Sequence, residues 1–180
     1  MSTNQNDRAR VREIAHEYFV RGFEAEMARS RALDSKTANL MGFTSVLTGL
    51  MIPFSAIAQG ELADLMKSVP TVKYSVDILF IGGVLLFFLA LLCFYQSLRV
   101  RGYKEPLRYK PKDLTHWESL GVEGLRVMLT KKYQQFWQHN KVQNDLKARW
   151  TQRGFTVLVL GGGVVVLSVC VIIGMFIMKA

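Results

Sequence analysis

Apolar and charged residues separate along this chain into long blocks. Three blocks are almost entirely apolar, at residues 37–58, 75–98 and 155–178, and the only charged side chain in them is Asp77. Each block exceeds the roughly 20 residues that a helix needs to cross a hydrocarbon core of about 30 Å. Inside lipid the backbone must satisfy its own hydrogen bonds, so such blocks form helices there. The pattern predicts an all-α membrane bundle with three transmembrane helices.

Charged segments come before the first block and between the second and third. The expected organisation, in chain order, is a cytosolic amphipathic helix (1–36), a first span (37–58), a short external loop (59–74), a second span (75–98), a cytosolic basic linker and long helix (99–154), a third span (155–178) and an external tail (179–180). The first 36 residues are too charged for a cleavable signal peptide, so the first span is expected to be a retained anchor.

The N-terminal charged segment, residues 6–36, contains no proline and repeats apolar residues at steps of three and four. This spacing predicts one long helix, and nothing before residue 37 forces it to end. The predicted stripe consists of Val11, Ile14, Tyr18, Ala25, Ala28 and Ala32, with Arg21 as its one polar member. We expect the stripe to pack against the chain's own second charged segment, with binding to a partner as the alternative.

The second charged segment opens with six bases and two prolines within residues 99–112, which is typical of an extended linker. Because this linker follows a membrane span directly, anionic lipid head groups are its expected partner, at about 1 kcal/mol per base. The residues expected to contact head groups are Arg99, Arg101, Lys104, Arg108, Lys110 and Lys112. The alternative is that Tyr103 and Tyr109 stack on nucleic-acid bases. Lipid already lies beside this linker, whereas a nucleic acid would have to be brought to it, so no nucleic-acid partner is expected.

A helix is predicted from His116 to about Trp150, with weak points at Gly121 and Gly124. Thr115 and Glu118 have the spacing of a capping box at its start.

One face of this helix changes from aromatic to amide side chains as it approaches the third block. The residues expected to pack on this face are Tyr133, Phe136, Trp137, Asn140 and Asn144. A buried asparagine in a helical seam fixes register at a cost in stability, so we expect Asn140 and Asn144 to set the register against residues 6–36, near its alanines.

The distribution of lysine and arginine predicts the orientation in the membrane. Twenty of the 23 lie before the first block or between the second and third, and three lie on the opposite side. The positive-inside rule then places the N terminus in the cytosol and the C terminus outside a cell membrane. The same bias accounts for most of the net charge of +9.

Residues with catalytic or metal-binding chemistry are few. His139 has no second histidine at a ligand spacing, and the two cysteines, Cys93 and Cys170, are expected at depths about 13 Å apart, too far for a disulfide. No enzyme activity, metal or cofactor is expected.

The layout resembles that of the SLATT and Pycsar-effector families of small prokaryotic membrane proteins. The resemblance rests on the junction "RSRALDSKTANLMGF" between the N-terminal helix and the first block, and on Asn140, Asn144 and Lys147 in the later helix. It implies a protein that oligomerises and permeabilises the membrane on a nucleotide signal during phage defence.

Two functions therefore remain in view. The first is an oligomerising, pore-like membrane effector with a cytosolic helical part that senses a signal or docks a partner. The second is a non-catalytic structural or accessory subunit of a membrane complex. The two hypotheses share the lipid bilayer as a partner and differ in whether the chain associates with itself.

Overall fold

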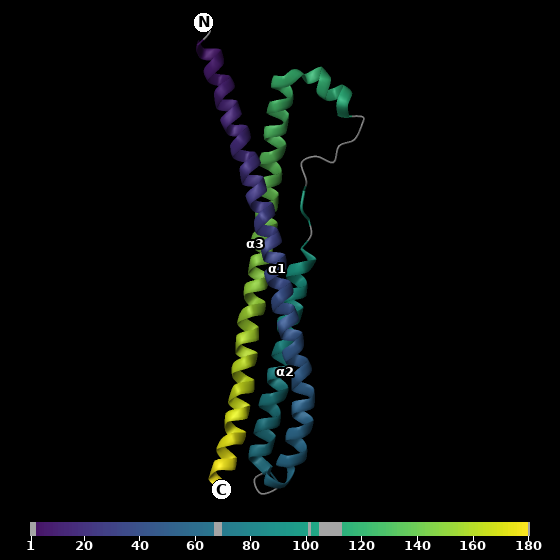
Figure 1. Ribbon diagram of the computed structural model, residues 1–180, viewed down its shortest axis with the longest axis vertical. Coiled ribbons are helices and arrows are strands. Elements are labelled where there is room, and N and C mark those ends of the chain that lie inside the picture. The colour runs from purple at the N-terminus through teal and green to yellow at the C-terminus, as the bar shows by residue number, and fades with distance from the viewer. Residues whose placement is uncertain (1–2, 67–69, 101, 105–112, 180) are drawn as a thin grey trace. The chain divides into compact units, whose positions relative to one another are not determined.

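The computed structural model describes the backbone of residues 3–66, 70–100, 102–104 and 113–179, and every regular element in these ranges is an α-helix (Figure 1). The helices are α1 (Thr3–Met66), α2 (Pro70–Arg99) and α3 (Asp113–Lys179). The predicted all-α class is confirmed. Two stretches, Tyr74–Arg99 and Ser119–Gly174, are long and apolar enough to cross a membrane. The first predicted span lies partly outside the described side chains.

Two of the helices join segments that the sequence pattern treats separately. α1 contains both the N-terminal amphipathic helix and the first apolar block, with Pro53 inside it. α3 contains both the later charged helix and the third apolar block. Its one departure from helical geometry is at Gly121, whose φ of 62° is readily adopted only by glycine, at one of the expected weak points. The capping-box side chains, Thr115 and Glu118, lie outside the described residues.

The chain forms two compact units. The polar unit contains Met1–Leu33 and Val100–Leu146, and the apolar unit contains Asp34–Arg99 and Lys147–Ala180. Each unit is built from parts of α1 and α3. The apolar unit adds α2, and the polar unit adds the short segment that follows α2.

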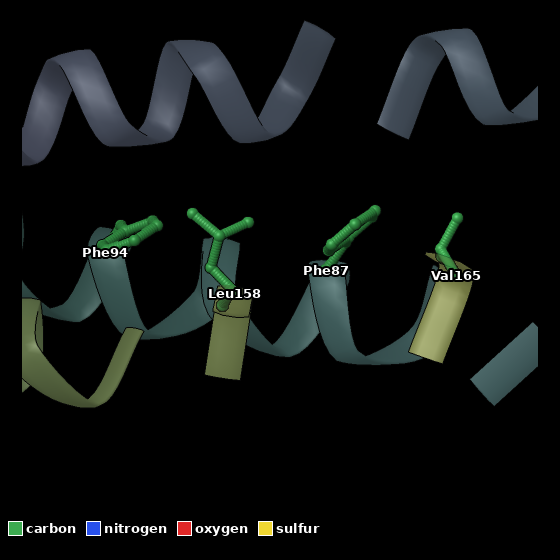
Figure 2. Close-up of a cluster of buried hydrophobic side chains, with 5 residues drawn as sticks. Phe87, Phe94, Leu158 and Val165 are labelled. Carbon is green, nitrogen blue, oxygen red and sulfur yellow. The ribbon is translucent and has the colours of Figure 1, made fainter. Parts of the chain in front are cut away.

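The hydrophobic core of the apolar unit is a single row of side chains along the helices. It consists of Phe87, Ala90, Phe94, Leu158 and Val165. Figure 2 shows Phe87 and Phe94 of α2 beside Leu158 and Val165 of α3, all pointing towards α1. From α1, Leu40, Met41, Leu47 and Met51 pack against this row. The three helices of this unit therefore share one narrow seam.

Most buried positions of α2 and α3 in the apolar unit are three or four residues apart. On α3 they are Lys147, Thr151, Gly154, Leu158, Gly161, Val165 and Ser168, and on α2 they are Val76, Gly83, Phe87, Ala90, Phe94 and Ser97, with Cys93 beside the seam. A repeat of 3.5 residues is the geometry of left-handed coiled-coil packing. The same face of each helix therefore stays in contact with its neighbour along the length of the seam.

Glycines allow the closest approach between α2 and α3. A Cβ atom on Gly154 would lie 2.6 Å from the Phe94 ring, one on Gly161 would lie 2.9 Å from the Phe87 ring, and one on Gly83 would lie 2.6 Å from Val165. Small residues at helix contacts have this role in membrane bundles. A Cβ atom on Gly42 or Gly49 of α1 would meet nothing within 4 Å inside the chain.

In the polar unit, α1 packs on α3 with a different face from the predicted one. The stripe residues Val11, Ile14 and Tyr18 are 60–65% exposed, and Ala25, Ala28 and Ala32 are also exposed. The face that packs carries His16, Phe19, Phe23, Met27 and Ser30 instead. The predicted stripe is therefore wrong as the internal packing face, because the aromatic side chains of α3 contact Phe19 and Phe23 in preference to the smaller alanines.

Candidate functional site

The amide of Asn140 holds the backbone that follows α2. Asn140 is fully buried; its Oδ1 accepts a hydrogen bond from the Lys104 backbone N–H at 3.0 Å, and its Nδ2 donates to the Lys104 carbonyl oxygen at 3.1 Å. The backbone N–H and carbonyl oxygen of Lys104 are thus both hydrogen-bonded to one side chain. Nδ2 also lies 3.8 Å from the Met27 sulfur of α1. Asn140 therefore contacts two other segments at once.

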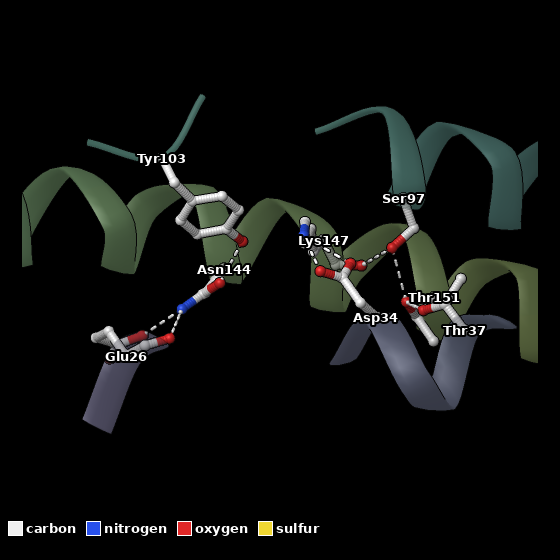
Figure 3. Close-up of polar contacts among 8 residues, drawn as sticks. All are labelled: Glu26, Asp34, Thr37, Ser97, Tyr103, Asn144, Lys147 and Thr151. Carbon is white, nitrogen blue, oxygen red and sulfur yellow. Dashed lines mark hydrogen bonds and ion pairs between the residues drawn. The ribbon is translucent and has the colours of Figure 1, made fainter. Parts of the chain in front are cut away.

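Asn144, one turn later, also contacts both α1 and the segment after α2 (Figure 3). Its Nδ2 lies 2.7 Å from both the backbone oxygen and the carboxylate Oε2 of Glu26. Its Oδ1 accepts a hydrogen bond from the Tyr103 hydroxyl at 2.5 Å. The sequence pattern predicts that the amides lie against Ala25, Ala28 and Ala32. They contact Glu26 and Met27 instead, because α1 turns its other face inward.

His139 completes the attachment of the segment after α2. Its Nε2 lies 2.6 Å from the Gly102 carbonyl oxygen, so residues 102–104 are hydrogen-bonded to α3 at each residue. These contacts give His139 a structural partner. Of the six bases expected at lipid head groups, Arg99 and Lys104 are exposed, and Arg101, Arg108, Lys110 and Lys112 lie outside the described residues.

Aromatic rings line the contact between α1 and α3 in the polar unit. Tyr133 lies edge-on to His16 and to Phe23, each with ring centroids 5.7 Å apart. Trp137 contacts the rings of Tyr18 and Phe19 and lies 3.2 Å from the position of a Cβ on Gly22. Phe136 is partly buried. Edge-to-face pairs of this kind stabilise by about 0.5–1.5 kcal/mol beyond the area they bury.

Lys147 is a charged side chain buried in the apolar unit. It is 2% exposed, and its Nζ lies 2.7 and 2.9 Å from the two carboxylate oxygens of Asp34. Its position three residues after Asn144 continues the spacing of the amides, and this spacing is the signal by which it could have been found. Burying a lysine is costly without such a partner.

A layer of hydroxyl groups joins all three helices of the apolar unit beside this ion pair. The Thr151 hydroxyl lies 2.8 Å from that of Thr37 and 2.9 Å from that of Ser97, and Ser97 also donates to the Lys147 carbonyl oxygen (Figure 3). Further along the seam, Thr44, Thr48 and Ser168 donate to carbonyl oxygens four residues earlier on their own helices. Hydroxyls satisfied in this way can lie inside a bundle without water.

These arrangements are suited to holding helices together. In the described part of the chain no group of three histidine, cysteine, aspartate or glutamate side chains is placed to hold a metal ion. Cys93 and Cys170 are both free thiols in the structure.

Comparison with known proteins returned no match to a family model, to a curated protein or to a solved structure. The function is therefore inferred from the residues and contacts of this chain.

Proposed function

We propose that this chain is a small multi-pass protein of the cell membrane. In this proposal it crosses the bilayer with three helices, keeps residues 1–36 and 99–154 in the cytosol, and self-associates as a pore-like effector.

The polarity of the apolar unit is the observation that carries the membrane assignment. The buried positions include hydroxyl side chains, whereas large apolar side chains face outwards. The exposed set in this unit includes Phe43, Val46, Leu50, Ile78, Ile81, Leu85, Leu92, Val159, Leu160, Val166 and Ile173. In water each such side chain would forgo about 1.5–3 kcal/mol of burial. In lipid the same side chains are solvated by acyl chains, and the hydroxyls are paired inside.

The orientation is supported by the excess of bases in the two charged segments. Twenty of the 23 lysines and arginines lie there, and this bias favours a cytosolic location for short segments beside membrane spans.

Self-association is supported by the exposed stripe of α1. Because α1 packs on α3 with another face, this heptad-spaced stripe stays largely exposed, although the Tyr18 ring touches Trp137 at its edge. The exposed stripe consists of Val11, Ile14, Tyr18, Ala25, Ala28 and Ala32. Copies inserted in one membrane share one orientation, so their stripes are parallel and could pair as in a parallel coiled coil. The resemblance to SLATT and Pycsar effectors is the support for a role in phage defence.

The membrane assignment is tested by a reporter fused after Ala180. We expect the reporter to be active outside the cytosol, because three crossings starting from a cytosolic N terminus end outside. A reporter fused before Met1 serves as the control and should be cytosolic. A cytosolic C-terminal reporter would mean that one of the three blocks does not cross.

Self-association is tested by cysteine crosslinking, in a background in which Cys93 and Cys170 are replaced by alanine. We expect Ala28→Cys to give a disulfide-linked dimer on oxidation, because disulfide formation needs Cα atoms about 4.4–6.8 Å apart. Lys141→Cys, exposed on α3, is the matched control and should remain monomeric.

The same protein reconstituted in liposomes distinguishes the effector from the second candidate, a structural or accessory subunit. The effector is expected to release an encapsulated dye as the protein-to-lipid ratio rises, and the subunit leaves the liposomes sealed.

A further inference from the structure

A groove lies on α3 where the charged part of the helix meets its apolar part. It has a volume of about 320 Å³ and is lined by Arg149, Gln152, Arg153, Thr156 and Val157. The four polar residues are exposed, and Val157 is partly buried against the core of the apolar unit. One end of the groove is therefore cationic and the other apolar.

The groove lies at the level where all three helices of the apolar unit change from charged to apolar. The hydroxyl layer of Thr37, Ser97 and Thr151 brings the three helices together at one level. Within two residues of this layer lie Lys36 of α1, Arg99 of α2, and Arg149 and Arg153 of α3. After Arg153 the next charged residue of α3 is Lys179. If the helices cross a bilayer as proposed above, this is the level of lipid phosphates on the cytosolic side.

The two arginines of the groove are available for an anion. In the described part of the chain neither guanidinium has a carboxylate within ion-pair distance, whereas Arg12, Arg21 and Arg29 each do. The Arg153 guanidinium lies over the Trp150 ring, 5.2 Å from its centroid. A guanidinium held over a ring keeps its edge donors free, and these donors match two phosphate oxygens.

The remaining polar groups add to this cationic pair. The Thr156 hydroxyl donates to the Gln152 carbonyl oxygen at 3.1 Å, so its oxygen is left to accept a hydrogen bond. The Gln152 side-chain amide offers both a donor and an acceptor. A ligand with a phosphate, a hydroxyl-bearing group on one side of it and an apolar chain on the other would match the groove from its cationic to its apolar end.

We propose that this groove binds one anionic phospholipid with a hydroxyl-bearing head group, such as a phosphatidylglycerol, through its phosphate. Arg149 and Arg153 hold the phosphate, Gln152 at the same level contacts the head-group hydroxyls, and Val157 contacts the first part of an acyl chain. The inference rests on the proposed membrane location. It gives the chain a discrete lipid site on α3, separate from the basic linker.

The test measures phospholipid bound to the purified, delipidated full-length protein by native mass spectrometry in detergent. Phosphatidylglycerol and phosphatidylcholine are titrated in parallel. The wild type is expected to bind one phosphatidylglycerol. The double variant Arg149→Gln/Arg153→Gln is expected to bind it at least about tenfold more weakly, because it lacks the charge-assisted contacts. Lys131→Gln/Lys141→Gln removes the same charge from exposed positions of α3 and should bind like the wild type.

A milder variant keeps the test informative if the double variant fails to fold. Arg153→Lys retains the charge but loses the planar fork over Trp150, so it should also bind more weakly. Equal weakening by the control pair, or wild-type binding by Arg153→Lys, would overturn a discrete site. Inorganic phosphate at millimolar concentration is added as a competitor. If it displaces the lipid fully and stabilises the protein as much as the lipid does, the groove is a free-anion site instead. The reporter after Ala180 separates the two proposals. If it lies outside the cytosol as expected and the arginine variants bind lipid like the wild type, only the lipid-site proposal is contradicted.

Discussion

Alanine substitutions along the glycines of α3 test the seam between α2 and α3. A Cβ atom on Gly154 or Gly161 would lie against Phe94 or Phe87, whereas one on Gly162 would have open space within 4 Å. Alanine at any of these positions gains about 0.5–1 kcal/mol from the lower conformational entropy of the unfolded chain. The gain is shared, so differences between the variants report the contact with α2 alone.

The size of the difference follows from the distances. A Cβ on Gly154 would lie 2.6 Å from Phe94 Cε1 and 3.2 Å from Cys93 Cβ, compared with an ordinary carbon separation of about 3.5–4.0 Å. Phe94 is fully buried, so either its ring must shift within the core or the two helices must move apart. Overpacking of this kind costs about 1–3 kcal/mol. We expect Gly154→Ala to be less stable than Gly162→Ala by that amount, with Gly161→Ala between them.

The assay is an SDS titration of each variant in mild-detergent micelles, followed by tryptophan fluorescence. Gly163→Ala, which also has open space, provides a second control. If Gly154→Ala and Gly162→Ala unfold at the same SDS fraction, α2 and α3 do not approach as closely as the glycine contacts indicate, and the seam assignment is refuted.

Three further predictions concern the polar groups and rings. Asn140→Leu should raise amide hydrogen exchange at Lys104 about fivefold or more, because the lost backbone hydrogen bond contributes about 1 kcal/mol. Unchanged exchange would contradict the attachment of residues 102–104. Asp34→Asn should destabilise by about 3 kcal/mol and more than Lys147→Met, since only the former leaves a buried charge unpaired; SDS titration of both shows the order. Trp137→Ala should lower the free energy of unfolding by about 3 kcal/mol, measured by thermal melting. An unchanged melting temperature would mean that α1 does not pack on Trp137.

The sequence alone predicted the helical class, the break at Gly121 and the continuity of α1, because periodicity and glycine act locally. It did not identify the packing face of α1 in the polar unit. Both the face with Val11 and Tyr18 and the face with Phe19 and Phe23 carry apolar residues at helical spacing, and the choice between them depends on the partner helix. Periodicity describes one helix at a time, so it cannot make that choice.

The glycine contacts and the buried ion pair were missed for different reasons. Gly154 and Gly161 are one heptad apart, as are Phe87 and Phe94, so a search for matched heptads would have paired them. Lysines near membrane spans are usually solvated, so nothing in the sequence around Lys147 indicates that it is buried. Its burial depends on Asp34, which is 113 residues away, and no local pattern reports such a pairing.

The hydroxyl and glycine contacts of the apolar unit have a thermodynamic consequence. The large heat-capacity change of protein unfolding comes from exposing apolar surface to water. In a bilayer, separating α2 from α3 at Gly154 and Gly161 would expose that surface to acyl chains and not to water, so this heat-capacity change would be small. The free energy of helix separation should therefore change almost linearly with temperature, without the low-temperature maximum of soluble domains. Cooling would keep strengthening this bundle where it weakens a water-soluble core.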